Sequence, residues 1–83
     1  MYQIDGRDQL FDWLSRETDQ AKRQLMLDWL VGFASDPLDS AQRLPGVRAP
    51  IYIAKTFVPR VLVVFLHAEM FKTVRILEFR RMP

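Results

Sequence analysis

The chain has 83 residues, which is enough for one small domain, and we expect a single domain over residues 1–83. Hydrophobic residues make up 49% of the sequence and charged residues 27%, a balance that excludes a disordered or fibrous chain. The sequence contains no cysteine and one histidine, which excludes disulfides and thiolate metal sites and argues against zinc. We therefore expect no metal and no cofactor.

The net charge of +2 conceals an uneven distribution along the chain. Residues 1–40 carry four basic and eight acidic side chains, a net charge of −4. Residues 41–83 carry eight basic and two acidic side chains, a net charge of +6. The sequence therefore predicts an acidic first half and a basic second half.

The first elements follow from alternation and helical spacing. Tyr2 and Ile4 alternate with a polar residue, which predicts one short strand. Asp5 precedes a helix predicted over residues 7–16 and is its expected N-terminal cap. The apolar face of that helix is formed by Leu10, Phe11, Trp13 and Leu14.

A second helix is predicted from Thr18 or Asp19 to about Ser35. It should end at Asp36 because a residue that precedes proline avoids helical backbone angles. Its core-facing stripe is expected to contain Leu25, Met26, Trp29, Leu30 and Phe33.

The character of the chain changes at Pro50. Residues 38–49 are expected to form a loop, because Leu44-Pro45-Gly46 is a turn signal. Beyond Pro50, β-branched and aromatic residues predict strands over residues 51–56, 61–66 and 73–79, with a turn over residues 67–71. The predicted fold class is α+β, in the order β-α-α-β-β-β, with a small antiparallel sheet packed against a two-helix layer.

Two groups of apolar residues exceed what one buried face requires. Leu27 and Val31 add a second apolar edge to the second helix, which indicates either deep core or a partner-binding surface. In the last strand, Val74 and Ile76 should share one face. The opposite face should then carry Arg75 together with two further candidate partner-binding residues, Leu77 and Phe79.

No motif with fixed catalytic spacing is present: the sequence has no phosphate-binding loop, nucleotide-binding glycine fingerprint or nucleophile elbow. His67 falls in a predicted turn, where a lone histidine is usually a polar surface residue. The remaining candidates are basic side chains on or beside the predicted strands. On the residues alone, the better explanation is that they are solvated strand-edge charges that discourage sheet aggregation.

The order of elements and several short motifs resemble the RelE/ParE superfamily of toxins from type II toxin–antitoxin modules. The resemblance covers nearly the whole chain. Its markers are Asp12-Trp13-Leu14, Ser35-Asp36-Pro37, the stretch Ala41–Gly46, the stretch Arg60–Val64, and Arg75-Ile76-Leu77 followed by Arg80-Arg81.

The resemblance implies a growth-inhibiting toxin that a cognate antitoxin protein neutralises. In the RelE branch the toxin enters the ribosome and cuts mRNA without a metal, using basic side chains around the scissile phosphate. Carried over by position, the catalytic residues are Arg60, Arg81 and Lys55. Additional nucleic-acid contacts are expected from Arg75, Arg80 and Arg48.

The sequence departs from the RelE pattern after the last strand, where Met82-Pro83 contains neither the tyrosine nor the histidine common in that branch. Two alternatives therefore stay open: a ParE-like inhibitor of DNA gyrase without nuclease activity, and a non-catalytic module that binds nucleic acid or protein. A homodimer is a further possibility.

We expect a cytoplasmic protein without a membrane anchor. Asp5, Arg7 and Asp8 occupy the region where a signal peptide has its apolar stretch. The apolar run Val61–Leu66 is far shorter than the roughly 20 residues that cross a membrane.

Overall fold

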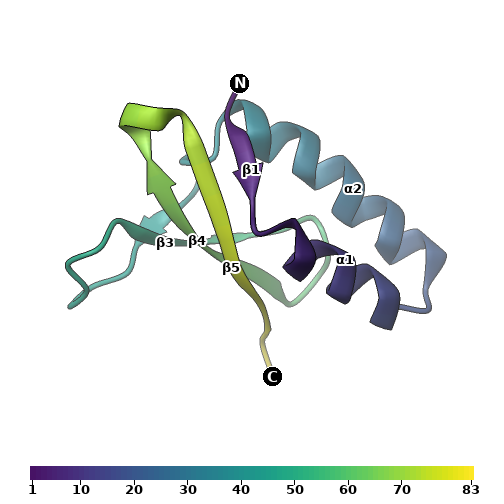
Figure 1. The fold of residues 1–83 in the computed structure, drawn as a ribbon. Coiled ribbons are helices and arrows are strands. Elements are labelled where there is room, and N and C mark those ends of the chain that lie inside the picture. Colours follow the sequence, from purple (N-terminus) through teal and green to yellow (C-terminus); the bar gives the residue numbers. More distant parts are fainter.

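The computed structural model describes all 83 residues, Met1–Pro83, and has the predicted α+β architecture. Two helices lie on one face of a five-stranded sheet, and the other face is left uncovered (Figure 1). The elements, in chain order, are β1 (Gln3–Asp5), α1 (Arg7–Arg16), α2 (Gln20–Ser35), β2 (Gln42–Arg43), β3 (Ile51–Lys55), β4 (Val61–Ala68), the 3-10 helix η1 (Glu69–Phe71) and β5 (Thr73–Arg81).

The sheet was expected to be antiparallel, but it is mixed. Its strand order is β1-β5-β4-β3-β2, and β1 pairs with β5 in parallel, with Gln3 opposite Thr73. All other pairs are antiparallel. The short strand β2 lies inside the segment predicted as a loop. It was missed because Gln42 and Arg43 are both exposed and show no apolar alternation.

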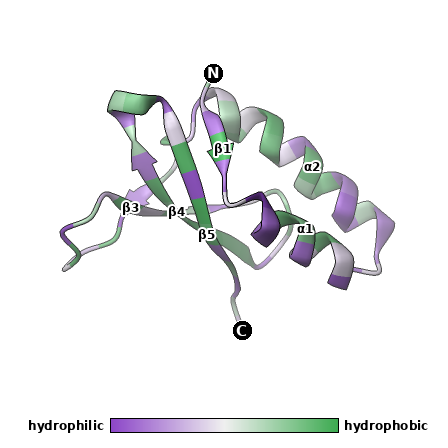
Figure 2. Ribbon diagram, viewed as in Figure 1, coloured by the Kyte–Doolittle hydropathy of each residue, from purple (hydrophilic) through white to green (hydrophobic).

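The core lies between the helices and the inner face of β4 and β5. Phe33 of α2 meets Phe65 of β4 edge-on, with ring centroids 4.8 Å apart, and stacks on Trp29 at 4.6 Å. Each such aromatic pair contributes about 0.5–1.5 kcal/mol beyond the area it buries. Hydrophobic and hydrophilic residues alternate along β5, where Val74 and Ile76 are buried (Figure 2).

The helix boundaries match the predicted ones, but the cap of α1 does not. Asp5 is the last residue of β1 and lies opposite Arg75 in the sheet. The residue that precedes α1 is Gly6, whose φ of 74° is a left-handed conformation. A Cβ atom at this position would lie 2.2 Å from the carbonyl oxygen of Ile76. Glycine is therefore required where the chain turns from β1 into α1.

Helix α2 begins as predicted, with the Asp19 side chain accepting a hydrogen bond of 2.9 Å from the backbone N–H of Ala21. Met26, Trp29 and Phe33 are buried along its inner face. Leu25 was expected in the same stripe, but its side chain is 37% exposed.

A β-bulge in β5 changes which side chains face the helices. Val64 lies opposite Glu78, whereas the next residue, Phe65, lies opposite Ile76, so Leu77 has no partner in β4. Alternation restarts after the bulge, and Phe79 turns inward against the helices, with its ring centroid 5.9 Å from that of Trp29. The predicted placement of Phe79 on the same face as Arg75 is therefore wrong.

Candidate functional site

The face of the sheet that the helices leave open carries a row of two basic side chains. Lys55 of β3 and Arg80 of β5 both lie opposite Leu62 of β4, one on each side. Adjacent strands are about 4.8 Å apart, so the two backbones are separated by about 10 Å. Long side chains at this spacing can contact one phosphate group between them.

Aliphatic side chains form the floor beneath this row. They belong to alternate positions of β3 and β4, which face away from the helices. Only Val64 is buried, and the others are half-buried. No aromatic ring lies among them, since Tyr52, Phe65 and Phe79 all point to the core. The floor consists of Ile51, Ile53, Leu62, Val64 and Leu66.

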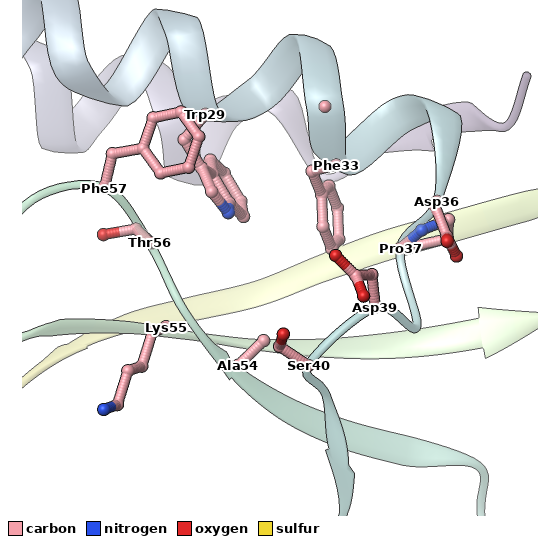
Figure 3. A pocket seen from close by; sticks show the side chains of 11 residues that line it. Trp29, Phe33, Asp36, Pro37, Asp39, Ser40, Ala54, Lys55, Thr56 and Phe57 are labelled. Atoms are coloured by element: carbon pink, nitrogen blue, oxygen red, sulfur yellow. The ribbon is translucent and has the colours of Figure 1, made fainter.

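The charges of this face differ in how far they are neutralised. Lys55 is exposed and forms no ion pair, and its ammonium group points away from α2 (Figure 3). Arg80 donates a hydrogen bond to Glu78 at 2.5 Å. Arg75 lies opposite Asp5 of β1. Lys55 and Arg75 are therefore the positive charges of the uncovered face that form no ion pair.

Arg60 and Arg81 come together at the neighbouring end of the sheet. Both line a hollow of about 210 Å³, which also contains Lys22 of α2. The backbone carbonyl of Arg60 accepts a hydrogen bond of 2.8 Å from the backbone N–H of Met82. Arg81 lies opposite Val61, whose side chain belongs to the core, so its register position is on the helix side of the sheet.

The three predicted catalytic residues therefore do not share one face. Lys55 lies with Arg80 on the uncovered face, whereas Arg60 and Arg81 lie around the strand ends. Arg48 lies in the loop between β2 and β3, and its carbonyl accepts a hydrogen bond from Arg43. Arg48 precedes the start of β3 at Ile51 by three residues, at the opposite end of that strand from Lys55, and lies apart from both groups.

The predicted partner-binding residues fall on three parts of the molecule. Leu27 and Val31 are 42% and 69% exposed, which excludes the deep-core alternative. They line an apolar groove of about 490 Å³ between α1, α2 and β1, together with Phe11. Leu77 is exposed at the bulge, and Phe79 lies between the sheet and the helices.

The fold has counterparts among solved structures. A chain of the archaeal RelE–RelB complex from Pyrococcus horikoshii matches with a TM-score of 0.77 and 16% identity, over 96% of this chain and 93% of that chain. The isolated RelE toxin of E. coli matches with a TM-score of 0.71 and 19% identity, over 100% of this chain and 86% of that chain. The chain has a RelE-like fold. No protein-family model and no curated protein sequence matches it.

The RelE-like domain contains a polar cluster that the sequence did not reveal. His67 is buried in β4, not in a turn, because the strand extends to Ala68. Its Nε2 atom lies 3.2 Å from the Tyr2 hydroxyl and 3.3 Å from Glu69 Oε2. Tyr2 donates a hydrogen bond to Glu69, which also accepts one of 2.6 Å from Lys72. No sequence signal links Tyr2 to residues 67–72, because the contact depends on the parallel β1–β5 pairing.

The hydrogen bonds of this cluster shift the pKa values of Tyr2, Glu69 and Lys72. The hydrogen bond with Glu69 raises the pKa of Tyr2, and the same carboxylate raises the pKa of Lys72. The hydrogen bonds from Lys72 and from Tyr2 lower the pKa of Glu69. The cluster ties β1 to the turn between β4 and β5.

In the RelE-like domain, no group of three or more His, Cys, Asp or Glu side chains lies close enough together to hold a metal ion. None of its helices is long and apolar enough to cross a membrane.

Proposed function

We propose that this protein is the toxin of a type II toxin–antitoxin module and cleaves mRNA on the ribosome without a metal. The observation that carries the proposal is the row formed by Lys55 and Arg80 on the uncovered sheet face of a RelE-like fold. The matching P. horikoshii chain belongs to a complex of RelE with RelB, which supports a protein partner for this chain as well.

The proposed reaction requires little covalent chemistry from the protein. The 2′-hydroxyl of the RNA attacks the adjacent phosphorus, the bond to the 5′-oxygen breaks, and a proton passes from the first oxygen to the second. Negative charge grows on the phosphate oxygens during this step. Lys55 and Arg80 stabilise it from either side of Leu62, and Arg60 and Arg81 hold the chain where it leaves the sheet.

A second candidate is a ParE-like toxin that inhibits DNA gyrase without cutting RNA. It is favoured by the aliphatic floor of the same face, because single-stranded nucleic acid is usually held by stacking of bases on aromatic rings. In addition, the histidine of the chain lies in the cluster with Tyr2 rather than beside Lys55. An aliphatic floor with a basic rim also suits a protein target.

The apolar groove containing Leu27 and Val31 is our proposed contact for the antitoxin. An amphipathic helix would cover its exposed apolar side chains. Val31→Asp should then abolish neutralisation by the antitoxin while growth arrest persists. If a second copy of the chain covers the groove instead, the same substitution converts a dimer to a monomer in size-exclusion chromatography.

Expression of this chain alone tests the function. It should arrest growth, and the protein encoded beside it should relieve the arrest. The double variant Lys55→Ala/Arg80→Ala should abolish arrest, whereas Arg16→Gln, which removes a positive charge from α1, should not. Harmless expression of the wild-type chain would refute the toxin function.

Mapping of mRNA ends by primer extension separates the two candidates. Cuts within ribosome-bound messages that disappear in the double variant support the nuclease. Growth arrest with intact messages and altered DNA supercoiling would refute the nuclease and support the gyrase inhibitor.

A further inference from the structure

A second hollow lies on the helix side of the sheet, at the C-terminal end of α2. It has a volume of about 340 Å³ and is bounded by α2, the turn that follows it and the end of β3 (Figure 3). Three aromatic rings form its walls: Trp29 and Phe33 from α2, and Phe57 from the turn after β3. Phe57 is 56% exposed, so one wall consists of an aromatic face accessible from solvent.

The backbone around this hollow is held in place before any ligand arrives. Thr56 Oγ1 donates a hydrogen bond of 2.9 Å to the carbonyl of Val61 and accepts one of 3.1 Å from the N–H of Val58. These bonds fix the turn that carries Phe57. On the opposite side, Gly32 leaves the hollow open, since a Cβ atom there would meet nothing within 4 Å.

The electrostatic character of the hollow is negative. Asp36 and Asp39 both line it, and neither carboxylate forms an ion pair or accepts a side-chain hydrogen bond. The last turn of α2 contains no basic residue, so nothing offsets the negative end of the helix dipole. Lys55 is the one basic residue that lines the hollow, but its ammonium group points away from it (Figure 3).

Aromatic walls, two free carboxylates and a helix C-terminus together favour one chemical class of ligand. A guanidinium group stacks on aromatic faces, donates paired hydrogen bonds to carboxylates and carries a permanent positive charge. An anionic ligand such as a nucleotide would meet the unpaired charges of Asp36 and Asp39.

We propose that this hollow, which we call the α2 pocket, binds an arginine side chain of a partner polypeptide. Free arginine is a poorer match, because its carboxylate would find no cation in the pocket once Lys55 points outward. The proposal does not depend on the toxin function, since the pocket lies on the helix side of the sheet and the row of Lys55 and Arg80 faces the other way.

The test is an NMR titration of the full ¹⁵N-labelled chain with a blocked tripeptide that has arginine in its centre. Saturable shifts are expected at the Trp29 indole N–H and the Gly32 amide. The matched citrulline peptide keeps the shape and lacks the charge, and it should bind about tenfold more weakly. Equal binding of the two peptides would overturn the proposal.

Variants locate the effect in the pocket. Asp36→Asn and Asp39→Asn should each weaken binding about threefold, as expected for exposed ion pairs, whereas Asp28→Asn, elsewhere on α2, should not change it. Gly32→Leu should abolish binding without unfolding the chain, because the new side chain enters the pocket from a helical position with free space. Binding that survives Gly32→Leu would refute the site.

Two further outcomes decide the source of the arginine. Free arginine that binds as tightly as the blocked peptide would overturn a polypeptide partner. Concentration-dependent shifts at Gly32 without any peptide would assign the arginine to a second copy of the chain and overturn a separate partner.

Discussion

The salt dependence of RNA binding tests the uncovered sheet face most directly. Lys55, Arg75 and Arg80 are the basic side chains that the strand register places there. For single strands, the logarithm of affinity falls with the logarithm of salt concentration by about 0.7 for each neutralised phosphate. Three contacts therefore give a slope of about −2, or a roughly 20-fold loss of affinity between 50 and 200 mM salt.

Lys55→Ala should reduce that slope to about −1.4 and the loss to about sevenfold, because one phosphate contact is removed. Glu78→Gln should act in the opposite direction, since Glu78 neutralises Arg80 in the free protein. Fluorescence anisotropy with a labelled oligonucleotide whose 2′-hydroxyls are replaced by hydrogen measures binding without cleavage.

Arg16→Gln is the control for this measurement. Arg16 lies on α1, which packs on the helix side of the sheet, and its charge is already paired with Asp12, so its loss should leave the slope unchanged. A wild-type slope near zero, or equal changes for Lys55→Ala and Arg16→Gln, would show that phosphates do not bind to this face.

Three further predictions concern the fold. Gly6→Ala should lower the unfolding free energy measured in urea titrations by about 2–4 kcal/mol, because it combines a left-handed backbone with a clash against Ile76. A loss under about 1 kcal/mol would contradict this account. Because the bulge turns Phe79 inward, Phe79→Ser should lower the unfolding free energy by about 2–3 kcal/mol and Leu77→Ser by less than about 0.5 kcal/mol. Similar losses in the two variants would mean that the register is wrong. Glu69 contributes stability above pH 4.5 that is lost as pH falls through its lowered pKa. In thermal melts, Glu69→Gln should therefore be less stable than wild type at pH 7, and the difference should shrink below pH 4.5. A difference that stays constant with pH would exclude the ion pair as its source.

Local sequence patterns were sufficient to predict the elements that form from residues close together in the sequence. The spacing of Trp29 and Phe33 predicted α2, and its observed N-terminal cap, Asp19, is one of the two residues at which the helix was predicted to begin. The run from Val61 to Leu66 likewise predicted β4 as the central strand.

Features that depend on distant pairing were not predictable in this way. The bulge at Leu77 is defined only by the register of β5 against β4, and alternation alone therefore placed Phe79 on the wrong face. The burial of His67 depends on Tyr2, which approaches it only because β1 joins β5 in parallel. For the same reason, the sequence could not show that the basic residues divide between the two faces of the sheet.

The pairing of β1 with β5 also determines when this protein can fold. Residues 3–5 contact residues 73–75, so about 70 residues must be synthesised before β1 has its partner. Helices α1 and α2 form from local contacts, but their apolar faces are covered only when β4 and β5 pack against them. At about 5–20 residues per second, a translating ribosome needs several seconds to supply β5 after β1 has emerged. Throughout that interval the sheet is incomplete, and the nascent chain has no assembled row of Lys55 and Arg80.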